Sequence, residues 1–177
     1  MKSENNPTLY WSLLKYKDWN FYIASTSKGL MFVGSQNKPF EELSEWAMKR
    51  LPGSSLVEDV EKLEPYALEI TQYLEGNRRN FTVPFDYNGT PFQNVVWNAL
   101  CEIPYGHTMS YSDIANVINK PAAVRAVGAA IGANPVLITV PCHRVVGKNG
   151  ALIGYRGGLE MKTKLLNLEK QGYSSNK

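Results

Sequence analysis

The chain has little cysteine and little histidine. Its 177 residues contain two of each, Cys101, Cys142, His107 and His143. Two cysteines cannot build the disulfide framework of a small secreted protein, and neither residue type shows the paired spacing of a zinc site. We therefore expect no metal or other cofactor, and a reducing cytoplasmic location.

Long apolar runs are also absent. No stretch approaches the roughly 20 apolar residues of a membrane span, and the first residues, MKSENNPTLY, lack the apolar core of a secretion signal. Apolar residues make up 44% and charged residues 20% of the chain, which is typical of an ordinary folded protein. A membrane partner is therefore not expected.

Charge is distributed unevenly, although the net charge is only +3. Residues 1–86 carry ten basic and twelve acidic side chains, whereas residues 87–177 carry nine basic and four acidic ones. A basic half beside an acidic half suggests a module that binds a polyanion, joined to a companion domain.

The first half has the alternating pattern of strands. Three aromatic and β-branched runs, LYWSLLKY, FYIASTS and GLMFVGS, are separated by polar turns, and Gly29 is expected to turn the chain with a positive φ. Apolar spacing predicts helices over residues 39–49 and 63–74. A last strand is expected at FTVPFDY, residues 81–87, where the proline favours an edge.

The second half reads as helical. A helix is predicted from Pro91 to Ile103, and a capping box between Ser110 and Asp113 starts a short one. Pro121 suits the first turn of the next helix, which would run to about residue 131. Two short helices joined by a tight turn make a helix-turn-helix pattern.

The remaining elements surround the second cysteine. A strand at VLITV leads into PCHRVV, followed by a glycine-rich hairpin over residues 147–158 and a helix over residues 159–170, with Gly172 past its end. The whole pattern predicts an α+β protein. An N-terminal α/β domain with a small antiparallel sheet would occupy residues 1–86, a mainly helical C-terminal domain residues 87–172, and a tail residues 173–177.

The second helix of the helix-turn-helix is unusual. Its sequence, PAAVRAVGAAIGAN, is almost all small and apolar, with Arg125 as its single charge. A helix that reads the major groove normally presents several polar side chains. Small residues suit close contact with a minor groove, but equally suit an interior helix, and the sequence leaves these alternatives open.

Cys142 lies in a context that favours reactivity. His143 and Arg144 follow it directly, and cations or imidazoles promote the thiolate. Adjacent side chains point apart, so His143 would reach the thiol only through a water, and Glu169 could orient the imidazole. A buried structural thiol and a hydrolase nucleophile both remain open. Cys101, on the apolar side of its helix, reads as core, and His107 as a surface residue.

Several motifs together resemble a known family. PFQNVVWNAL, IPYG, YSDIA, RAVGAAIGANP, PCHRVVGKNG and GYRGGLEMKTKLL follow in order over about residues 91–169. They are similar to the O6-alkylguanine-DNA alkyltransferases, or methylated-DNA–protein-cysteine S-methyltransferases. The N-terminal half resembles the companion domain of that family only in its order of elements, for which an RNase H-like sheet is implied.

The resemblance implies a DNA repair reaction. Cys142 would take the alkyl group from O6 of a guanine flipped out of duplex DNA, with His143 as its water-linked base and Glu169 polarising the imidazole. Tyr111, with an unperturbed phenol pKa near 10, would donate toward the N3 edge of the base, and Asn134 would brace the active-site turn. The thioether product cannot be hydrolysed, so each molecule would act once. Activity on O4-alkylthymine is left open.

The resemblance also implies two sets of binding residues. The DNA-binding set lies along the second helix of the helix-turn-helix and its partner: Arg125, Tyr111, Ala123, Ala126 and Gly128. The alkylguanine pocket would use Val145, Tyr155, Arg156 and Gly157. The expected partner is double-stranded DNA with O6-alkylguanine, contacted through its minor groove by a monomer whose cooperativity on DNA is open.

One departure from the family stands out. Some members carry a structural zinc in the N-terminal domain, but residues 1–86 contain neither cysteine nor histidine, so no metal is expected there. Two rival functions remain: a non-catalytic binder of alkylated DNA, and a cysteine hydrolase built on Cys142, His143 and Glu169.

Overall fold

A four-stranded sheet organises the N-terminal domain of the computed structural model, which describes residues 6–174. The strand order is β3-β2-β1-β4, antiparallel over the first three strands, with β4 added in parallel to β1. The α+β prediction is confirmed, but the sheet is mixed rather than purely antiparallel. The strands are β1 (Thr8–Tyr16), β2 (Trp19–Ser25), β3 (Leu30–Val33) and β4 (Ser55–Glu58).

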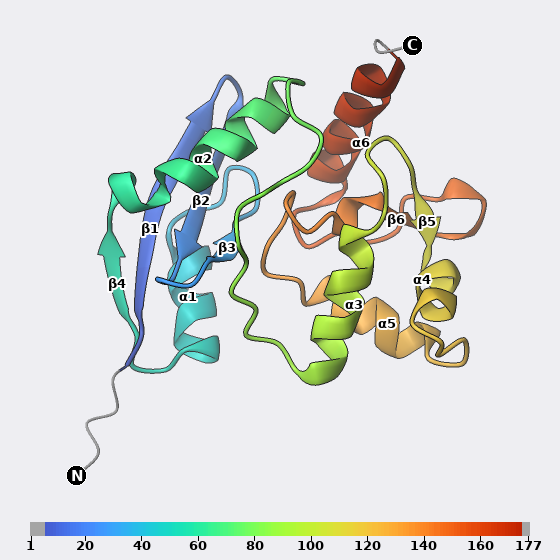
Figure 1. The fold of residues 1–177 in the computed structure, drawn as a ribbon, viewed down its shortest axis with the longest axis horizontal. Coiled ribbons are helices and arrows are strands. Elements are labelled where there is room, and N and C mark those ends of the chain that lie inside the picture. Colours follow the sequence, from blue (N-terminus) through green and yellow to red (C-terminus); the bar gives the residue numbers. More distant parts are fainter. Residues whose placement is uncertain (1–5, 175–177) are drawn as a thin grey trace.

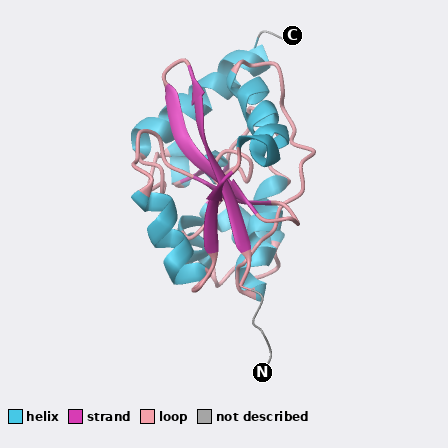
Figure 2. Ribbon diagram, turned by 90° about the vertical axis from the view of Figure 1, so that its left-hand side faces the viewer, coloured by secondary structure: helices cyan, strands magenta, loops and turns pink. Residues whose placement is uncertain are grey.

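Alternation along the strands divides the sheet into two apolar faces. Phe21 and Ile23 pack in the cluster that contains the buried side of α2 (Val60–Leu74), whereas Ala24 packs with α1 (Glu41–Arg50). Successive side chains of a strand point to opposite faces, so one strand serves both helices. Figure 2 shows the strands edge-on, with helices to either side.

Two expectations for this domain are wrong. Residues 81–87 form no strand: Phe85 makes an isolated bridge to Leu30, whose N–H donates to Pro84 O at 2.9 Å. The segment crosses the sheet edge instead of extending it, because proline has no N–H to continue a ladder. Gly29 does not adopt a positive φ; a Cβ there would lie 2.7 Å from Pro84 O, so close backbone approach requires the glycine.

The C-terminal domain is mainly helical and lies beside the sheet (Figure 1). The predicted capping box is present, with Ser110 Oγ accepting from Asp113 N. A second capping box, from Thr90 to Gln93, starts α3. The elements are α3 (Pro91–Cys101), β5 (Met109–Ser110), α4 (Tyr111–Val117), α5 (Val124–Gly132), η1 (Cys142–Arg144), β6 (Val145–Val146), η2 (Lys148–Gly150) and α6 (Leu159–Ser174).

Several predicted boundaries in this domain are wrong. α5 begins at Val124, with Pro121 in the preceding turn. VLITV is a tight turn rather than a strand, with Ile138 at φ 66°, and residues 147–158 form a loop without strands. Gly172 lies inside α6, which extends to residue 174, so the expected tail is partly helical, and residues 175–177 lie outside the described part of the chain.

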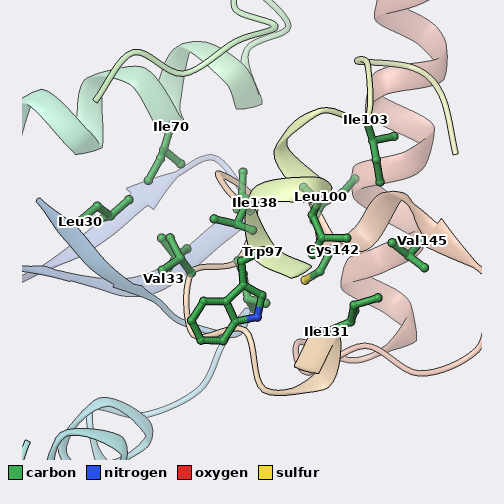
Figure 3. Packing of buried hydrophobic residues seen from close by; sticks show 14 of the residues in the cluster. Leu30, Val33, Ile70, Trp97, Leu100, Ile103, Ile131, Ile138, Cys142 and Val145 are labelled. Atoms are coloured by element: carbon green, nitrogen blue, oxygen red, sulfur yellow. The ribbon is translucent and has the colours of Figure 1, made fainter. Parts of the chain in front are cut away.

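One buried cluster joins the two domains. Leu30 and Val33 of the sheet share it with Trp97, Leu100 and Cys142 of the C-terminal domain, and Figure 3 shows them converging. Val33 also bridges directly to residue 136. The sheet therefore supports the segment that leads into Cys142. Among residues 6–174, no helix has the length and apolar character that crossing a membrane requires.

Candidate active site

Asn134 shapes the turn that presents Cys142. Its Nδ2 donates to Val136 O, Val140 O and Cys142 Sγ, each at 3.2 Å, while its Oδ1 accepts from Val136 N at 2.9 Å. Asn134 is fully buried, and Cys142 is 3% exposed. A single amide thus closes the turn at both ends and places the thiol at the start of η1.

Burial raises the pKa of the Cys142 thiol, and this effect outweighs the hydrogen bond from Asn134 and the positive charges of Arg156 and Lys162, which lower it. Desolvation penalises the thiolate more than these partners favour it. The thiol is therefore protonated at neutral pH, and a base must remove its proton before it can act as a nucleophile.

His143 points to Glu169 across the site. Its Nε2 lies 2.6 Å from Glu169 Oε2, and the imidazole is fully buried. Burial lowers the pKa of His143, despite the opposing effect of the Glu169 carboxylate. Nδ1 has no hydrogen-bond partner among the described atoms. A neutral imidazole with Nε2–H on the carboxylate leaves Nδ1 as the basic nitrogen.

Glu169 is the centre of this buried polar cluster. Arg144 donates to it through Nε at 2.8 Å and a terminal nitrogen at 3.0 Å, and Gly106 N donates at 3.2 Å. Tyr73 Oη also donates to Oε2. The hydrogen bond from His143 and the charge of Arg144 hold the pKa of the carboxyl group at about 2, despite its burial. Glu169 is therefore a permanent anion beside the imidazole.

Sequence reasoning missed Arg144 and Tyr73 as parts of this cluster. The sequence indicates Arg144 only as a positive charge near the thiol. In the structure its side chain donates to Ile103 O at 2.6 Å in addition to Glu169. Tyr73 lies 96 residues before Glu169 on the other domain. A tyrosine on the apolar stripe of a helix looks like ordinary core in the sequence, so no local signal marks it.

Cys142 lies in the wall of a cavity of about 130 Å³. Of the four residues expected to form the alkylguanine pocket, Tyr155 and Arg156 line this cavity, whereas Val145 and Gly157 do not belong to its lining. The helix-turn-helix contributes further walls, of which Ile131 and Gly132 were not among the predicted site residues. The lining is Tyr111, Gly128, Ile131, Gly132, Cys142, Gly154, Tyr155 and Arg156.

Tyr111 reaches the cavity from the start of α4. Its hydroxyl donates to Ile153 O at 3.0 Å. The expectation of an unperturbed phenol is wrong, because burial, followed by the nearby Cys142, raises the pKa of Tyr111. The hydroxyl therefore remains a proton donor over the whole physiological range.

Two cations fix the loop on the far side of the cavity. The Arg156 side chain turns into the domain junction, donating to Val33 O at 2.6 Å and to Asn134 O and Pro135 O at 3.0 Å. Lys162, which is fully buried and was missed by sequence reasoning, donates to Val145 O at 2.6 Å and also to the carbonyls of residues 153 and 154. Arg156 thus lines the cavity while its guanidinium clamps the two domains.

α5 is neither fully interior nor polar on its outer side. Val127 is buried, Arg125 and Ala126 are exposed, and Ala123 and Gly128 are half-buried. The helix therefore packs one face on the core and leaves the other open, with Arg125 at its start, so the interior-helix reading does not hold.

The two remaining cysteine and histidine residues behave differently from each other. Cys101 is exposed at the end of α3, so the core reading for it is wrong. His107 is exposed in a loop, as predicted. Over residues 6–174, no three histidine, cysteine or acidic side chains are grouped so that they could hold a metal ion.

Comparisons with known proteins agree over both domains. The family model described as "6-O-methylguanine DNA methyltransferase, DNA binding domain" matches residues 91–171, and the model for the ribonuclease-like domain of the same family matches residues 9–87. The chain is 81% identical over 170 residues to the inducible methylated-DNA–protein-cysteine methyltransferase of Bacillus subtilis, covering 96% of this chain and 95% of that protein.

Solved structures of methyltransferases are also similar to this chain. The crystal structure of O6-methylguanine methyltransferase from Mycobacterium tuberculosis superposes with a TM-score of 0.79 at 35% identity, covering 93% of this chain and 94% of that one. The M. tuberculosis protein in complex with DNA gives 0.77 at 34% identity, covering 92% and 94%. With both domains matched in order, this chain belongs to the 6-O-methylguanine DNA methyltransferase family.

Proposed function

We propose that the protein repairs O6-alkylguanine in duplex DNA by transferring the alkyl group to Cys142. One observation carries this proposal: the thiol lines a cavity whose other walls include Tyr111, Gly128 and Ile131 of the helix-turn-helix. A DNA-reading motif and a nucleophile therefore share one small space. The activity is that of a methylated-DNA–[protein]-cysteine S-methyltransferase, the activity named for its relatives.

The chemistry follows from the protonation states. His143, neutral and with a free Nδ1, takes the thiol proton through a water, and Glu169 stabilises the imidazolium that results. The sulfur attacks the alkyl carbon, a C–S bond forms, and the C–O6 bond breaks. Guanine gains a proton from the Tyr111 hydroxyl, which lies in the cavity, as the C–O6 bond breaks. Afterwards the imidazolium of His143 loses its proton to water, and the Tyr111 phenolate takes one from water.

Base flipping is part of this proposal, because O6 of guanine is not accessible to a buried thiol while the base is stacked. The open face of α5 would lie in the minor groove, where small residues such as Ala126 allow close approach. Arg125 projects from its first turn and would fill the space of the extruded nucleotide. The flipped base would rest against Tyr155 and the loop around Arg156.

The product makes the reaction a single event. A thioether has no good leaving group for water to displace, so S-alkyl-Cys142 would persist. We propose that the protein acts as a monomer that is consumed in the reaction.

Intact-mass analysis tests the proposal. After incubation with a duplex that contains O6-methylguanine, we expect one added methyl group, mapped to Cys142, at one equivalent per molecule. Cys142→Ala should bind the same duplex and gain no mass, whereas Cys101→Ala, which removes the exposed thiol, should react like the wild type. An unmodified wild-type protein bound tightly to the lesion would indicate a binder, and ester or amide turnover a hydrolase.

A further inference from the structure

Tyr73 reaches the active site from the N-terminal domain. It lies on α2, is fully buried, and packs its ring on Phe81 and Tyr105. Its hydroxyl donates to Glu169 Oε2 and lies 3.4 Å from His143 Nε2. One carboxylate oxygen therefore serves both Tyr73 and His143.

Polar groups from several elements converge on this carboxylate. Arg144 of η1 supplies the main positive charge. The positive charge of Lys162, on the same helix as Glu169, lowers the pKa of His143. The guanidinium of Arg79 lies 5.0 Å from the centre of the Tyr105 ring. The titratable and charged groups that face the His143–Glu169 pair are Tyr73, Tyr105, Arg144, Tyr155 and Lys162.

Sharing one oxygen has an electrostatic consequence. A phenol that donates to a carboxylate disperses part of the negative charge, so the carboxylate stabilises a neighbouring imidazolium less strongly. It also fixes the carboxylate in one rotamer, which keeps Nε2–H of His143 directed at Glu169. The lone pair of the imidazole then stays on Nδ1.

Building on the proposed alkyl transfer, we propose that Tyr73 is a positioning residue for this reaction. Its hydroxyl holds Glu169 so that His143 rests as a neutral base with Nδ1 available to the thiol of Cys142. The N-terminal domain thereby takes part in the reaction through a single hydroxyl group, in addition to supporting the core.

Histidine titration by NMR tests this role without any DNA chemistry. Tyr73→Phe removes one hydroxyl and leaves Glu169 its bonds to Arg144 and Gly106, so the variant should fold. We expect the pKa of His143 to rise in Tyr73→Phe, because the full charge of Glu169 then acts on the imidazole. The chain has two histidines, so the exposed His107 provides the reference signal.

Tyr66→Phe is the matched control. Tyr66 lies two turns earlier on α2 and has Asp86 rather than Glu169 as its charged neighbour, so Tyr66→Phe should leave the titration of His143 unchanged. An identical His143 titration in the wild type and Tyr73→Phe would refute the proposal.

The rate of methyl transfer gives a second readout. At neutral pH we expect the second-order rate constant of Tyr73→Phe to fall about tenfold, which corresponds to the loss of one hydrogen bond to a charged group. We also expect the acid limb of its pH–rate profile to move toward higher pH. A fall of equal size at every pH would mean a merely structural role and overturn the proposal. If the wild type itself gained no methyl group, the proposed function would fail, while the titration would still decide the role of Tyr73.

Discussion

The thiol of Cys142, the nucleophile of the proposed reaction, is held in its protonated form. Burial raises the pKa of its thiol, and burial also keeps His143 neutral. Thiolates are the species that oxidants attack, so a protonated, enclosed thiol is protected until substrate arrives. In the proposed reaction, the ionised Glu169 would stabilise the positive charge that forms on the imidazole. We therefore expect the thiolate of Cys142 to form only during the reaction.

The depressed pKa of Glu169 makes the stability of the protein depend on pH. Its pKa falls from the ordinary 4.5 to about 2 in the folded state, so its contribution is complete above pH 4.5 and is lost as the pH falls through 2. We expect Glu169→Gln to lower the free energy of unfolding at neutral pH by about 3 kcal/mol, since Arg144 loses its buried partner. Denaturant melts at several pH values measure this.

The melts below pH 4.5 test whether Glu169 causes this pH dependence. The wild type should lose stability between pH 4.5 and pH 2, and the difference from Glu169→Gln should narrow there. A difference that stays constant down to pH 2 would contradict the assignment. Glu160→Gln, an exposed change at the start of the same helix, is the control and should have little effect.

At the scale of elements, α5 has one face that packs in the core and one face that is open to solvent. Val127, Ala130 and Ile131 bury one face, while the opposite face carries side chains no larger than methyl groups apart from Arg125. A helix with such a face can approach a nucleic-acid groove closely but cannot hold a base by hydrogen bonds. We therefore expect the charge of Arg125 to have a large share in the contacts that this helix makes with DNA.

Arg125→Ala tests that share. We expect repair of a methylated duplex to slow by at least tenfold, because the extruded base loses its replacement in the stack, while reaction with the free base O6-methylguanine stays within about twofold of the wild type. Methyl transfer to Cys142 is measured on both substrates. Lys49→Ala, an exposed cation at the end of α1, is the control. Equal losses on both substrates would contradict a flipping role.

The loop between β6 and α6 contains no strand and is held by hydrogen bonds from side chains. Arg156, within the loop, donates to Val33 O of the sheet. Lys162 donates to Val145 O before the loop and to Ile153 O within it, and the Tyr111 hydroxyl also donates to Ile153 O. The guanidinium of Arg156 reaches across to the sheet, so the position of this cavity wall depends on the docking of the two domains. A planar fork of donors can do this, whereas lysine at residue 156 could not.

At the scale of the whole molecule, the two domains share a core. Leu30 and Val33 lie in one cluster with Trp97 and Cys142, and Tyr73 enters the polar site from the N-terminal side. Separating the domains would expose this cluster and leave the Glu169 carboxylate without one of its donors. The fold is therefore expected to be cooperative.

Calorimetry should show one unfolding transition, with equal calorimetric and van't Hoff enthalpies. Gly29→Ala should lower the free energy of unfolding by about 2 kcal/mol, since its Cβ would meet backbone at 2.7 Å where the linker crosses the sheet, and the single transition should move as a whole. Gly132→Ala, which meets no atom within 4 Å, is the control. Two resolved transitions would show that the domains unfold separately.

Local chemistry explains which elements could be predicted. The capping box of Ser110 and Asp113 and the apolar stripe of α3 involve neighbours in sequence, so they are visible in it. The segment at residues 81–87 has the composition of a strand, but it pairs with the edge strand β3 only through the bridge between Phe85 and Leu30 and forms no ladder. The expectation that Cys101 belongs to the core is wrong because α3 ends at Cys101, before the predicted end at Ile103, and leaves the side chain exposed.

The sequence alone determined the chemistry that is available here: one cysteine beside a histidine, a glutamate on the last helix, and a helix of small residues with one arginine. Only the tertiary structure decided how these groups act. Burial sets the pKa values of Cys142 and His143, and chain topology brings Tyr73 to a carboxylate 96 residues away. Desolvation and long-range contacts depend on the packed whole, so no local pattern can reveal them.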